Sequence, residues 1–269
     1  MSGLFRRLIL TSLTLACLSV TGLAQAGETL QRVIDFKTLK VGMTADQPPL
    51  NMLSRDKNLM GFDVDLAKAL ANAMRVKLEI KVMPFGDLMS SLDNGTIDMV
   101  ISGMAITPER SEEAAFVGPY MMSGKSLLTK DSVLAKVSGS DEFNRGDLTL
   151  TALKNSTSAS FVREGAPEAT LIEVEHYDEA VKMILEGDAD GMVADMPVCR
   201  LTVLRFPDLG LVTLDKPLTV EPIGIALDKD DREFFNLVDN YLEAYTRIGV
   251  VAQLRKQWLE DKEWLAALP

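Results

Sequence analysis

Short apolar runs alternate with amphipathic segments in the first half of the chain. Three apolar runs with the length of buried strands lie at residues 39–45, 78–85 and 96–102. Between the first two runs, large apolar residues recur at every fourth position: Phe62, Leu66, Leu70 and Met74. Residues four apart fall on one face of an α-helix, so this segment predicts a helix that packs on a sheet. A shorter helix, ending near Gly95, is predicted before the third run, and the alternation of strands with helices indicates an α/β fold with parallel strands.

The same alternation begins again in the second half. Apolar runs typical of strands lie at residues 147–153, 170–175 and 189–195, with helical segments between them. The stretch LDNGTIDMVIS, which ends at Ser102, is similar to LEGDADGMVAD, which ends at Asp195. In both, a helix end is followed by glycine, an acid and a Met-Val strand. The restarted order and this local similarity predict two similar lobes.

Two extended runs connect the predicted lobes, at residues 123–132 and 216–230, and two helical segments separated by Gly249 follow the second run. A second lobe that is inserted into the first through two crossings leaves a cleft between the lobes, where ligands usually bind. We therefore expect lobe 1 to comprise residues 27–125 and 219–269, and lobe 2 to comprise residues 126–218.

The segment 1–26 is predicted to be a secretory signal peptide. Two arginines precede an apolar run over residues 8–24, and small residues favour cleavage after Ala26. The run is shorter than the about 20 apolar residues that a membrane-spanning helix needs, which disfavours an anchor. Lipid attachment at Cys17 is an alternative, but Thr14 stands where a lipoprotein usually has leucine. We expect a protein that is exported to the periplasm.

Composition narrows the classes of partner and chemistry. Hydrophobic residues make up 47% of the chain, enough for a sizeable core. Removing residues 1–26 removes two of 28 basic residues and none of 39 acidic ones, which leaves a net charge of −13 and disfavours nucleic acid or anionic lipid as a partner. Only Cys199 then remains, so no internal disulfide can form. The sole histidine, His176, is expected in a surface loop, and neither a metal site nor a cofactor is expected.

A cation at a predicted helix start is the first candidate functional residue. In the segment SGMAITPER, Thr107 is predicted to cap a helix with Pro108 at its first position, which puts Arg110 in the first turn. The helix dipole disfavours a positive charge there by up to about 1 kcal/mol. Two explanations are open. Arg110 forms surface ion pairs with nearby glutamates, or it extends into the cleft and binds a carboxylate through two parallel hydrogen bonds.

Polar residues also follow the predicted strand ends of lobe 2. In open α/β sheets, ligands bind beyond the carboxyl ends of the strands. Asp195 ends one strand, where it either caps the next helix or accepts a ligand ammonium group. Ser156 and Thr157 follow another strand, where they act as helix caps, and the free N–H groups of that helix end also suit an anion.

Three segments together resemble a known protein family: LKVGMTADQPPLNM, GFDVDLAKALANAM and LMSSLDNGTIDMVISGMAITPERSEEAAFVGPY. They are similar to the family 3 bacterial solute-binding proteins, periplasmic receptors of polar amino-acid ABC importers, and the resemblance extends from about residue 38 to Trp258. It implies the type II periplasmic-binding-protein fold, an α/β fold with two lobes, two crossing strands as the hinge and a ligand cleft between the lobes. It also implies a monomer without cofactors, which captures an amino acid or a closely related small carboxylate and delivers it to a permease in the inner membrane.

The resemblance assigns roles to individual residues. Arg110 matches the arginine that binds the ligand α-carboxylate, and Asp195 matches the acid that binds the α-ammonium group. Thr157 matches a second carboxylate contact, with Ser156 beside it. Gly103 matches a position where the backbone or a serine contacts the ligand.

Other positions depart from the family pattern. Ala105 stands where a hydroxyl residue is usual, and Gln47 stands where an aromatic residue commonly stacks on the ligand. With Met104 nearby, the side-chain pocket is predicted to be aliphatic, which disfavours cationic amino acids because their stacking partner is missing. Phe62, in the GFDVDLA segment, completes the candidate ligand-binding residues.

A non-catalytic receptor is the leading function. An enzyme of the cyclohexadienyl dehydratase type, which resembles this family, is one alternative, but no nucleophile–base pair is visible and no catalytic residue is assigned. A ligand-binding sensor or accessory protein is the other alternative.

Overall fold

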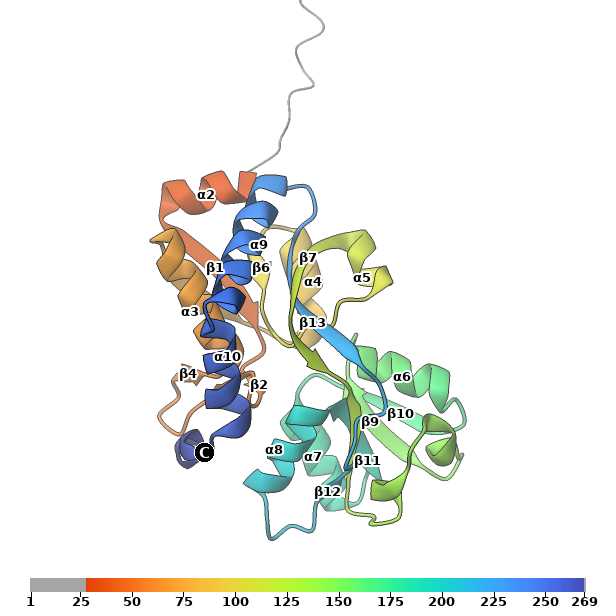
Figure 1. Cartoon of the computed structure of the whole chain (residues 1–269). Helices are drawn as coiled ribbons and strands as arrows, with labels where there is room; N and C mark the ends of the chain where they lie inside the picture. The colour runs from red at the N-terminus through yellow and green to blue at the C-terminus, as the bar shows by residue number, and fades with distance from the viewer. Residues whose placement is uncertain (1–27, 269) are drawn as a thin grey trace, which may run out of the picture.

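The computed structural model describes residues 28–268, which form two lobes that are each built around a five-stranded sheet (Figure 1). The predicted signal peptide, with the alternative lipidation residue Cys17, lies outside the described residues. The sheet of lobe 1 has the strand order β5 (Lys77–Val82), β1 (Thr38–Met43), β6 (Met99–Val100), β13 (Glu221–Asp228) and β7 (Ala114–Ser123). Strand β1 is parallel to β5 and β6, whereas β13 is antiparallel to β6 and β7.

Lobe 2 repeats this arrangement. Its sheet has the strand order β10 (Thr170–Val174), β9 (Thr149–Leu153), β11 (Gly191–Asp195), β8 (Lys125–Thr129) and β12 (Val212–Thr213). Strand β9 is parallel to β10 and β11, and β8 is antiparallel to β11 and β12. The apolar runs of the sequence thus correctly predict the three parallel strands of each lobe. The two extended runs supply β8 and β13, so the segments that cross between the lobes also enter the sheets.

The crossing strands lie side by side at the hinge. Strand β7 continues through Gly124 into β8, and β13 runs antiparallel to β7 with Glu221 opposite Ser123. The N–H of Lys125 donates a hydrogen bond to Thr219 Oγ1 at 2.9 Å. A Cβ atom on Gly124 would lie 1.9 Å from the carbonyl oxygen of Thr219, so the close approach of the two crossings requires glycine. Figure 1 shows β7 and β13 passing together from one lobe to the other.

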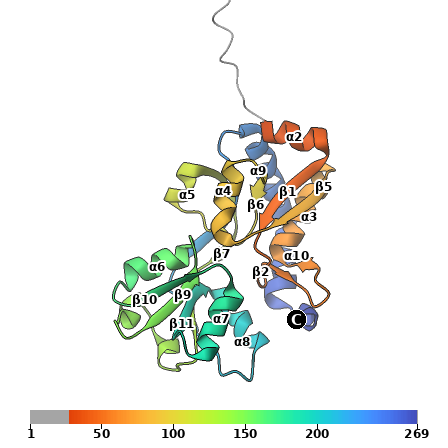
Figure 2. The same cartoon turned by 180° about the vertical axis from the view of Figure 1, so that it is seen from behind.

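Helices cover both sheets, as the opposite view in Figure 2 also shows. Lobe 1 carries α2 (Glu28–Phe36), α3 (Phe62–Met74), α4 (Leu88–Asp93), α5 (Pro108–Glu113), α9 (Arg232–Arg247) and α10 (Val250–Arg255). Lobe 2 carries α6 (Thr157–Gly165), α7 (Tyr177–Glu186) and α8 (Met196–Arg205). A small sheet that contacts α3 consists of β2 (Asp46–Gln47), β3 (Asn51–Leu53) and β4 (Leu59–Met60). Short 3₁₀ or π turns lie at Phe85–Asp87, Leu134–Lys136, Ser140–Phe143, Lys256–Glu260 and Glu263–Ala267.

The predicted apolar face of α3 forms part of the core of lobe 1. Phe62, Leu66 and Leu70 are fully buried, in one cluster with residues of β1 and α9. Burying one such side chain contributes about 1.5–3 kcal/mol. The strands from which the loops of this lobe leave are therefore held by a well-packed core. No helix within residues 28–268 is long and apolar enough to cross a membrane.

Candidate functional site

Arg110 lies in the first turn of α5, as the sequence predicts. Thr107 is the N-cap residue: its Oγ1 accepts a hydrogen bond from the N–H of Arg110 at 3.2 Å, and Pro108 occupies the first helical position. This cap holds the backbone of Arg110 in place while its side chain extends towards lobe 2.

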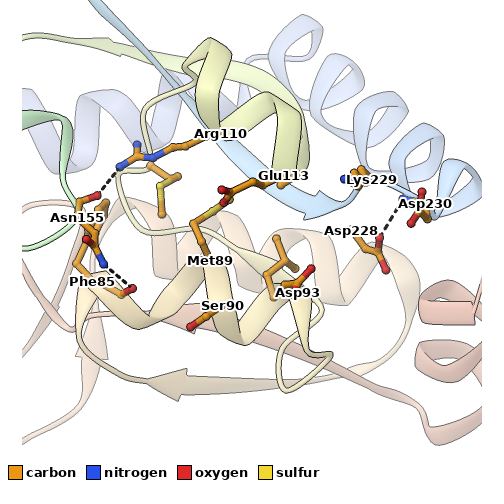
Figure 3. Close-up of a pocket in the computed structure, with 14 residues that line it drawn as sticks. Phe85, Met89, Ser90, Asp93, Arg110, Glu113, Asn155, Asp228, Lys229 and Asp230 are labelled. Carbon is orange, nitrogen blue, oxygen red and sulfur yellow. Dashed lines mark hydrogen bonds between the residues drawn. The ribbon is translucent and has the colours of Figure 1, made fainter. Parts of the chain in front are cut away.

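The Arg110 guanidinium contacts carbonyl groups from both lobes. Its Nη1 donates to the carbonyl of Ala105 at 2.9 Å, and its Nη2 donates to the carbonyl of Asn155 at 3.1 Å. Figure 3 shows the contact with Asn155. The Cζ atom lies 5.6 Å from the ring centroid of Phe85, within the range of a cation–π contact. No ion pair within residues 28–268 involves Arg110, so the surface pairing with glutamates is not formed.

The charge of Arg110 therefore has no direct counter-ion in the described part of the chain. Burial lowers the pKa of Arg110 because it disfavours the charged form, and attraction to Glu221 and Asp195 acts in the opposite direction. Arginine stays charged at physiological pH in either case. A cation whose hydrogen bonds go to neutral carbonyl groups suits an anionic ligand, because a carboxylate accepts two guanidinium hydrogen bonds at once.

A pocket of about 710 Å³ lies beside Arg110 (Figure 3). Its apolar lining includes Phe85, Met89, Leu92, Met104 and Ala114. Its polar lining includes Arg110, Asn155, Ser90, Asp93 and Glu113. The predicted methionine Met104 belongs to this lining, and Phe85 adds an aromatic ring to a pocket that the sequence predicts to be aliphatic. Phe85 was assigned to a strand, whereas β5 ends at Val82 and Phe85 begins a 3₁₀ turn after Pro84, which brings its ring to Arg110.

A second group of charged residues lies where the strands cross between the lobes. We call Lys125, Asp195 and Glu221 the hinge charge cluster. The Nζ of Lys125 lies 3.1 Å from Asp195 Oδ1 and 2.9 Å from Glu221 Oε2. Ser123 Oγ also donates to Asp195 Oδ1 at 3.2 Å, and Thr157 Oγ1 donates to Glu221 Oε2 at 2.9 Å. Lys125 is only 1% exposed, so its ammonium group is held almost entirely by these partners.

Strand register explains how the cluster forms. Lys125 and Asp195 are opposite each other in the antiparallel pair β8–β11, which makes them cross-strand neighbours. Glu221 is the first residue of β13 and joins them at the crossing. The sequence analysis identified Asp195 and Thr157 but missed Lys125 and Glu221. The available signal was a lysine and a glutamate that are the single charged residues of the stretches 123–129 and 217–227.

The loop before α6 provides the lobe 2 side of the Arg110 contact. Ser156 is the N-cap of α6, with its Oγ accepting from the N–H of Ala159 at 3.1 Å, so the predicted capping role is confirmed. Asn155 adopts a left-handed backbone with φ 57°, which asparagine tolerates well. Its side chain donates a hydrogen bond to the carbonyl of Gly86 at 3.3 Å, while its own backbone carbonyl accepts the hydrogen bond from Arg110 Nη2. Asn155 therefore joins the two lobes twice.

A buried carboxylate supports the loop at the end of β6. Asp63, which is fully buried, accepts hydrogen bonds at Oδ2 from the N–H of Gly103 at 3.0 Å and from Asn51 Nδ2 at 2.9 Å. Its Oδ1 accepts from the hydroxyl of Tyr120 at 2.8 Å. Burial raises the pKa of Asp63 to about 6, although these hydrogen bonds lower it. The backbone N–H of Gly103, at a predicted ligand position, is thus bound within the protein.

Three other predicted site residues lie inside lobe 1. Gln47 is 3% exposed, and its Oε1 accepts a hydrogen bond from Ser102 Oγ at 3.4 Å. Phe62 is fully buried and stacks on Tyr120 with a centroid distance of 5.5 Å, so the structure places it in the core and not at the cleft. Ala105 is 3% exposed, and its backbone carbonyl accepts the hydrogen bond from Arg110 Nη1.

His176 lies in the exposed loop between β10 and α7, as the sequence predicts, and it also contacts lobe 1. It stands immediately before α7, and its Nδ1 lies 3.2 Å from Asp46 Oδ2 in β2 of lobe 1. The imidazole remains about half exposed. His176 therefore takes part in a second contact between the lobes.

Comparisons with known proteins agree with this architecture. Residues 39–261 match the bacterial extracellular solute-binding proteins, family 3. The chain is 32% identical over 216 residues to the glutamine-binding protein of Geobacillus stearothermophilus, covering 79% of this chain and 80% of that protein. It is 27% identical over 256 residues to cyclohexadienyl dehydratase of Pseudomonas aeruginosa, covering 95% of each chain.

A solved structure gives the same result for the fold. The crystal structure of an ancestral amino acid-binding protein, a precursor of cyclohexadienyl dehydratase, superimposes with a TM-score of 0.79 at 33% identity, covering 87% of this chain and all of that one. The predicted two-lobed periplasmic-binding-protein fold is thereby confirmed. The chain belongs to the family 3 bacterial extracellular solute-binding proteins.

Proposed function

We propose that this protein captures an amino acid or a closely related small carboxylate between its lobes and delivers it to an ABC importer. The observation that carries the proposal is the Arg110 guanidinium, which donates hydrogen bonds to one carbonyl of each lobe, Ala105 and Asn155, and forms no ion pair with any residue between 28 and 268. A ligand carboxylate supplies the charge that these carbonyls lack. The family membership and the binding functions of most of the matched relatives support the same reading.

Closure of the lobes links capture to delivery. The lobes, which we place at residues 27–125 with 219–269 and at residues 126–218, rotate about the two crossing strands. Asn155 reaches both Arg110 and Gly86 only when the lobes are together. A ligand that binds this closed arrangement better than the open one shifts the equilibrium towards it. The closed, ligand-loaded monomer is the form that a permease in the inner membrane recognises, after export of the protein to the periplasm.

A thermal-shift screen of the exported protein against amino acids and related carboxylates tests the proposal. A ligand at about 100 times its dissociation constant adds about 2.7 kcal/mol of stability, which raises the melting temperature measurably. Calorimetry then gives affinity and stoichiometry for each positive compound. The absence of any carboxylate that binds with one-to-one stoichiometry contradicts the proposal.

An enzyme is the second candidate function. It is favoured by the alignment with cyclohexadienyl dehydratase over 95% of both chains and by the carboxylate–ammonium pair of Asp195 and Lys125 at 3.1 Å. Such a pair can hold a proton donor beside a bound substrate. Incubation of the exported protein with a cyclohexadienyl carboxylate such as prephenate separates the two functions. Product formed over many turnovers establishes the enzyme, whereas stoichiometric binding without product favours the receptor.

A further inference from the structure

His176 and Asp46 form a contact between the lobes that is an ion pair only when the imidazole is protonated. Asp46 belongs to β2 of lobe 1, whereas His176 stands directly before α7 of lobe 2, and its Nδ1 lies 3.2 Å from Asp46 Oδ2. We propose that protonation of His176 favours closure of the lobes, so that ligand affinity is higher at mildly acidic pH and falls as the pH rises. The inference rests on the proposed function and describes how the same site is regulated.

In the described part of the chain, the carboxylate of Asp46 forms no ion pair with a lysine or an arginine. Its side chain is 15% exposed, and its Oδ2 also accepts the N–H of Tyr177 at 3.3 Å. Burial raises the pKa of Asp46, and the contact with His176 lowers it, because a nearby positive charge stabilises the ionised carboxyl. A proton on His176 therefore adds the positive charge that this largely buried carboxylate lacks.

The other charged groups near His176 belong to lobe 2. They are Glu175, Asp178, Glu179 and Arg205. Asp178 lies 3.3 Å from Arg205, and Glu175 lies 3.1 Å from Lys154. These groups move together with His176 when the lobes separate, so their effect on the imidazole is the same in the open and closed arrangements. A pocket of about 590 Å³ lies at this contact, and Asp46 is the only titratable residue of lobe 1 among the described residues that line it.

The composition of the chain makes this contact easy to isolate. His176 is the sole histidine, and histidine is the side chain whose charge ordinarily changes between about pH 5 and 8. Burial raises the pKa of Asp63 to about 6, but the hydrogen-bond partners of Asp63 all belong to lobe 1, so separation of the lobes leaves them in place. Burial raises the pKa of Cys199 to about 12, outside this range. A change in ligand affinity between pH 6 and pH 8 therefore points to His176.

The direction of the effect follows from the partner that closure supplies. An imidazolium always donates from Nδ1, whereas a neutral imidazole does so in only one of its two tautomers. Because the carboxylate of Asp46 is beside His176 only when the lobes are together, closure takes up protons. The advantage is complete at a pH where histidine is protonated in both arrangements, and it is lost as the pH rises above about 6.5. The imidazole is about half exposed, so water screens the pair and keeps the gain in affinity at about two- to fivefold.

Calorimetry with the exported protein at pH 6 and pH 8 tests the inference. The probes are L-glutamine, L-glutamate and L-arginine, together with any carboxylate that binds in the thermal-shift screen. We expect the tightest-binding compound to bind about two- to fivefold more tightly at pH 6 than at pH 8. An affinity that is equal at both pH values, or higher at pH 8, overturns the inference and leaves the proposed function intact. If no compound binds at either pH, both fail.

Two variants assign the effect to this contact. His176→Gln cannot be protonated, and Asp46→Asn keeps an oxygen for the N–H of Tyr177 but removes the charge. In both, the ratio of affinities at pH 6 and pH 8 is expected to fall by about two- to fivefold relative to the wild type. Titration of the ligand itself affects all proteins equally and cancels in this comparison.

Lys182→Gln is the matched control, because Lys182 is an exposed residue of α7 that pairs with Glu186 in the same helix. It should keep the wild-type ratio. A pH dependence that persists unchanged in both His176→Gln and Asp46→Asn belongs to another group and contradicts the inference, even where the wild type binds more tightly at pH 6.

Discussion

Asp46 of lobe 1 caps a helix of lobe 2, because its Oδ2 accepts the N–H of Tyr177, the first residue of α7, at 3.3 Å. A carboxylate at a helix N-terminus is stabilised both by the free N–H groups and by the helix dipole. Caps normally come from the preceding residues of the same chain segment. Here the cap is available only when the lobes are together, so it contributes to closure and not to the stability of either lobe alone.

Removing this interlobe cap should weaken ligand binding without preventing folding. In Asp46→Ala the N–H of Tyr177 and the His176 imidazole both lose their carboxylate partner, so the closed arrangement is less populated. We expect ligand affinity to fall by about two- to thirtyfold, which corresponds to the about 0.5–2 kcal/mol that a helix cap contributes. Calorimetry measures this effect, and Asp56→Ala, at an exposed turn, is the control. Unchanged affinity in Asp46→Ala shows that the cap does not bias closure.

Closure should also change the fluorescence of the tryptophans. Trp258 and Trp264 pack with a centroid distance of 5.4 Å and line a groove of about 310 Å³ whose other wall is α8 of lobe 2, including Met196 and Leu201. Movement of α8 alters the polarity around these rings. We expect ligand addition to shift the emission maximum, and Trp264→Phe to reduce the shift. Calorimetric binding without any change in emission indicates that α8 does not move relative to the C-terminal segment.

Arg110 is expected to dominate ligand affinity. Arg110→Ala removes two charge-assisted hydrogen bonds of about 1.5–3 kcal/mol each, so with partial replacement by water affinity should fall about a hundredfold or more. Arg110→Lys keeps the charge but not the paired hydrogen-bond geometry, so its ligand affinity should lie between those of Arg110→Ala and the wild type. Arg163→Ala is the control, because Arg163 forms a surface ion pair with Glu173. Equal affinities for Arg110→Ala and the wild type, measured by calorimetry, exclude the carboxylate contact.

Local patterns explain which parts of the fold could be predicted. The parallel strands are short apolar runs bounded by turns, and the start of α5 has both a capping threonine and a proline. Strand β7 was missed because its burial does not alternate: buried Ala114 and Val117 are separated by two partly exposed residues, and two exposed residues follow. Its extended shape comes from pairing with β13, which lies more than a hundred residues later in the chain.

The candidate site depends even more on contacts between distant parts of the chain, which the sequence pattern does not indicate. Arg110 could be found because an arginine in a first helical turn is a local anomaly. The other site residues meet only at the two crossings, as Lys125 and Glu221 do, or through the approach of the lobes, as Asn155 and Arg110 do. No spacing rule in the sequence connects Lys125 with Glu221, since they meet through the register of separate strands.

The hinge should not tolerate a side chain at Gly124. In Gly124→Ala the new Cβ would lie 1.9 Å from the carbonyl oxygen of Thr219. The Cβ is attached to one crossing segment, and the oxygen belongs to the backbone of the other. Relief requires the crossings to separate, which we expect to cost at least about 1–3 kcal/mol of unfolding free energy. Gly146→Ala is the control, because its nearest neighbour would be 3.7 Å away. Urea denaturation measures both, and a Gly124→Ala protein as stable as the wild type contradicts the close packing of the crossings.

The buried carboxyl of Asp63 makes stability depend on pH. Because burial raises its pKa from an ordinary value of 3.8 to about 6 in the folded state, the folded protein holds the proton more tightly than the unfolded chain. Its stabilising contribution is therefore complete below about pH 4, decreases as the pH rises through 6, and is lost above that value.

Asp63→Asn isolates this contribution. An asparagine can accept from Gly103 and Asn51 and donate to the oxygen of Tyr120, as the protonated acid does, but it does not titrate. We expect the unfolding free energy of the wild type, measured relative to Asp63→Asn by urea denaturation, to decrease by about 2–3 kcal/mol between pH 4 and pH 7. Asp63→Ala should lower stability at every pH, because three buried donors lose their acceptor. A wild-type difference from Asp63→Asn that does not vary with pH shows that Asp63 is already charged across this range.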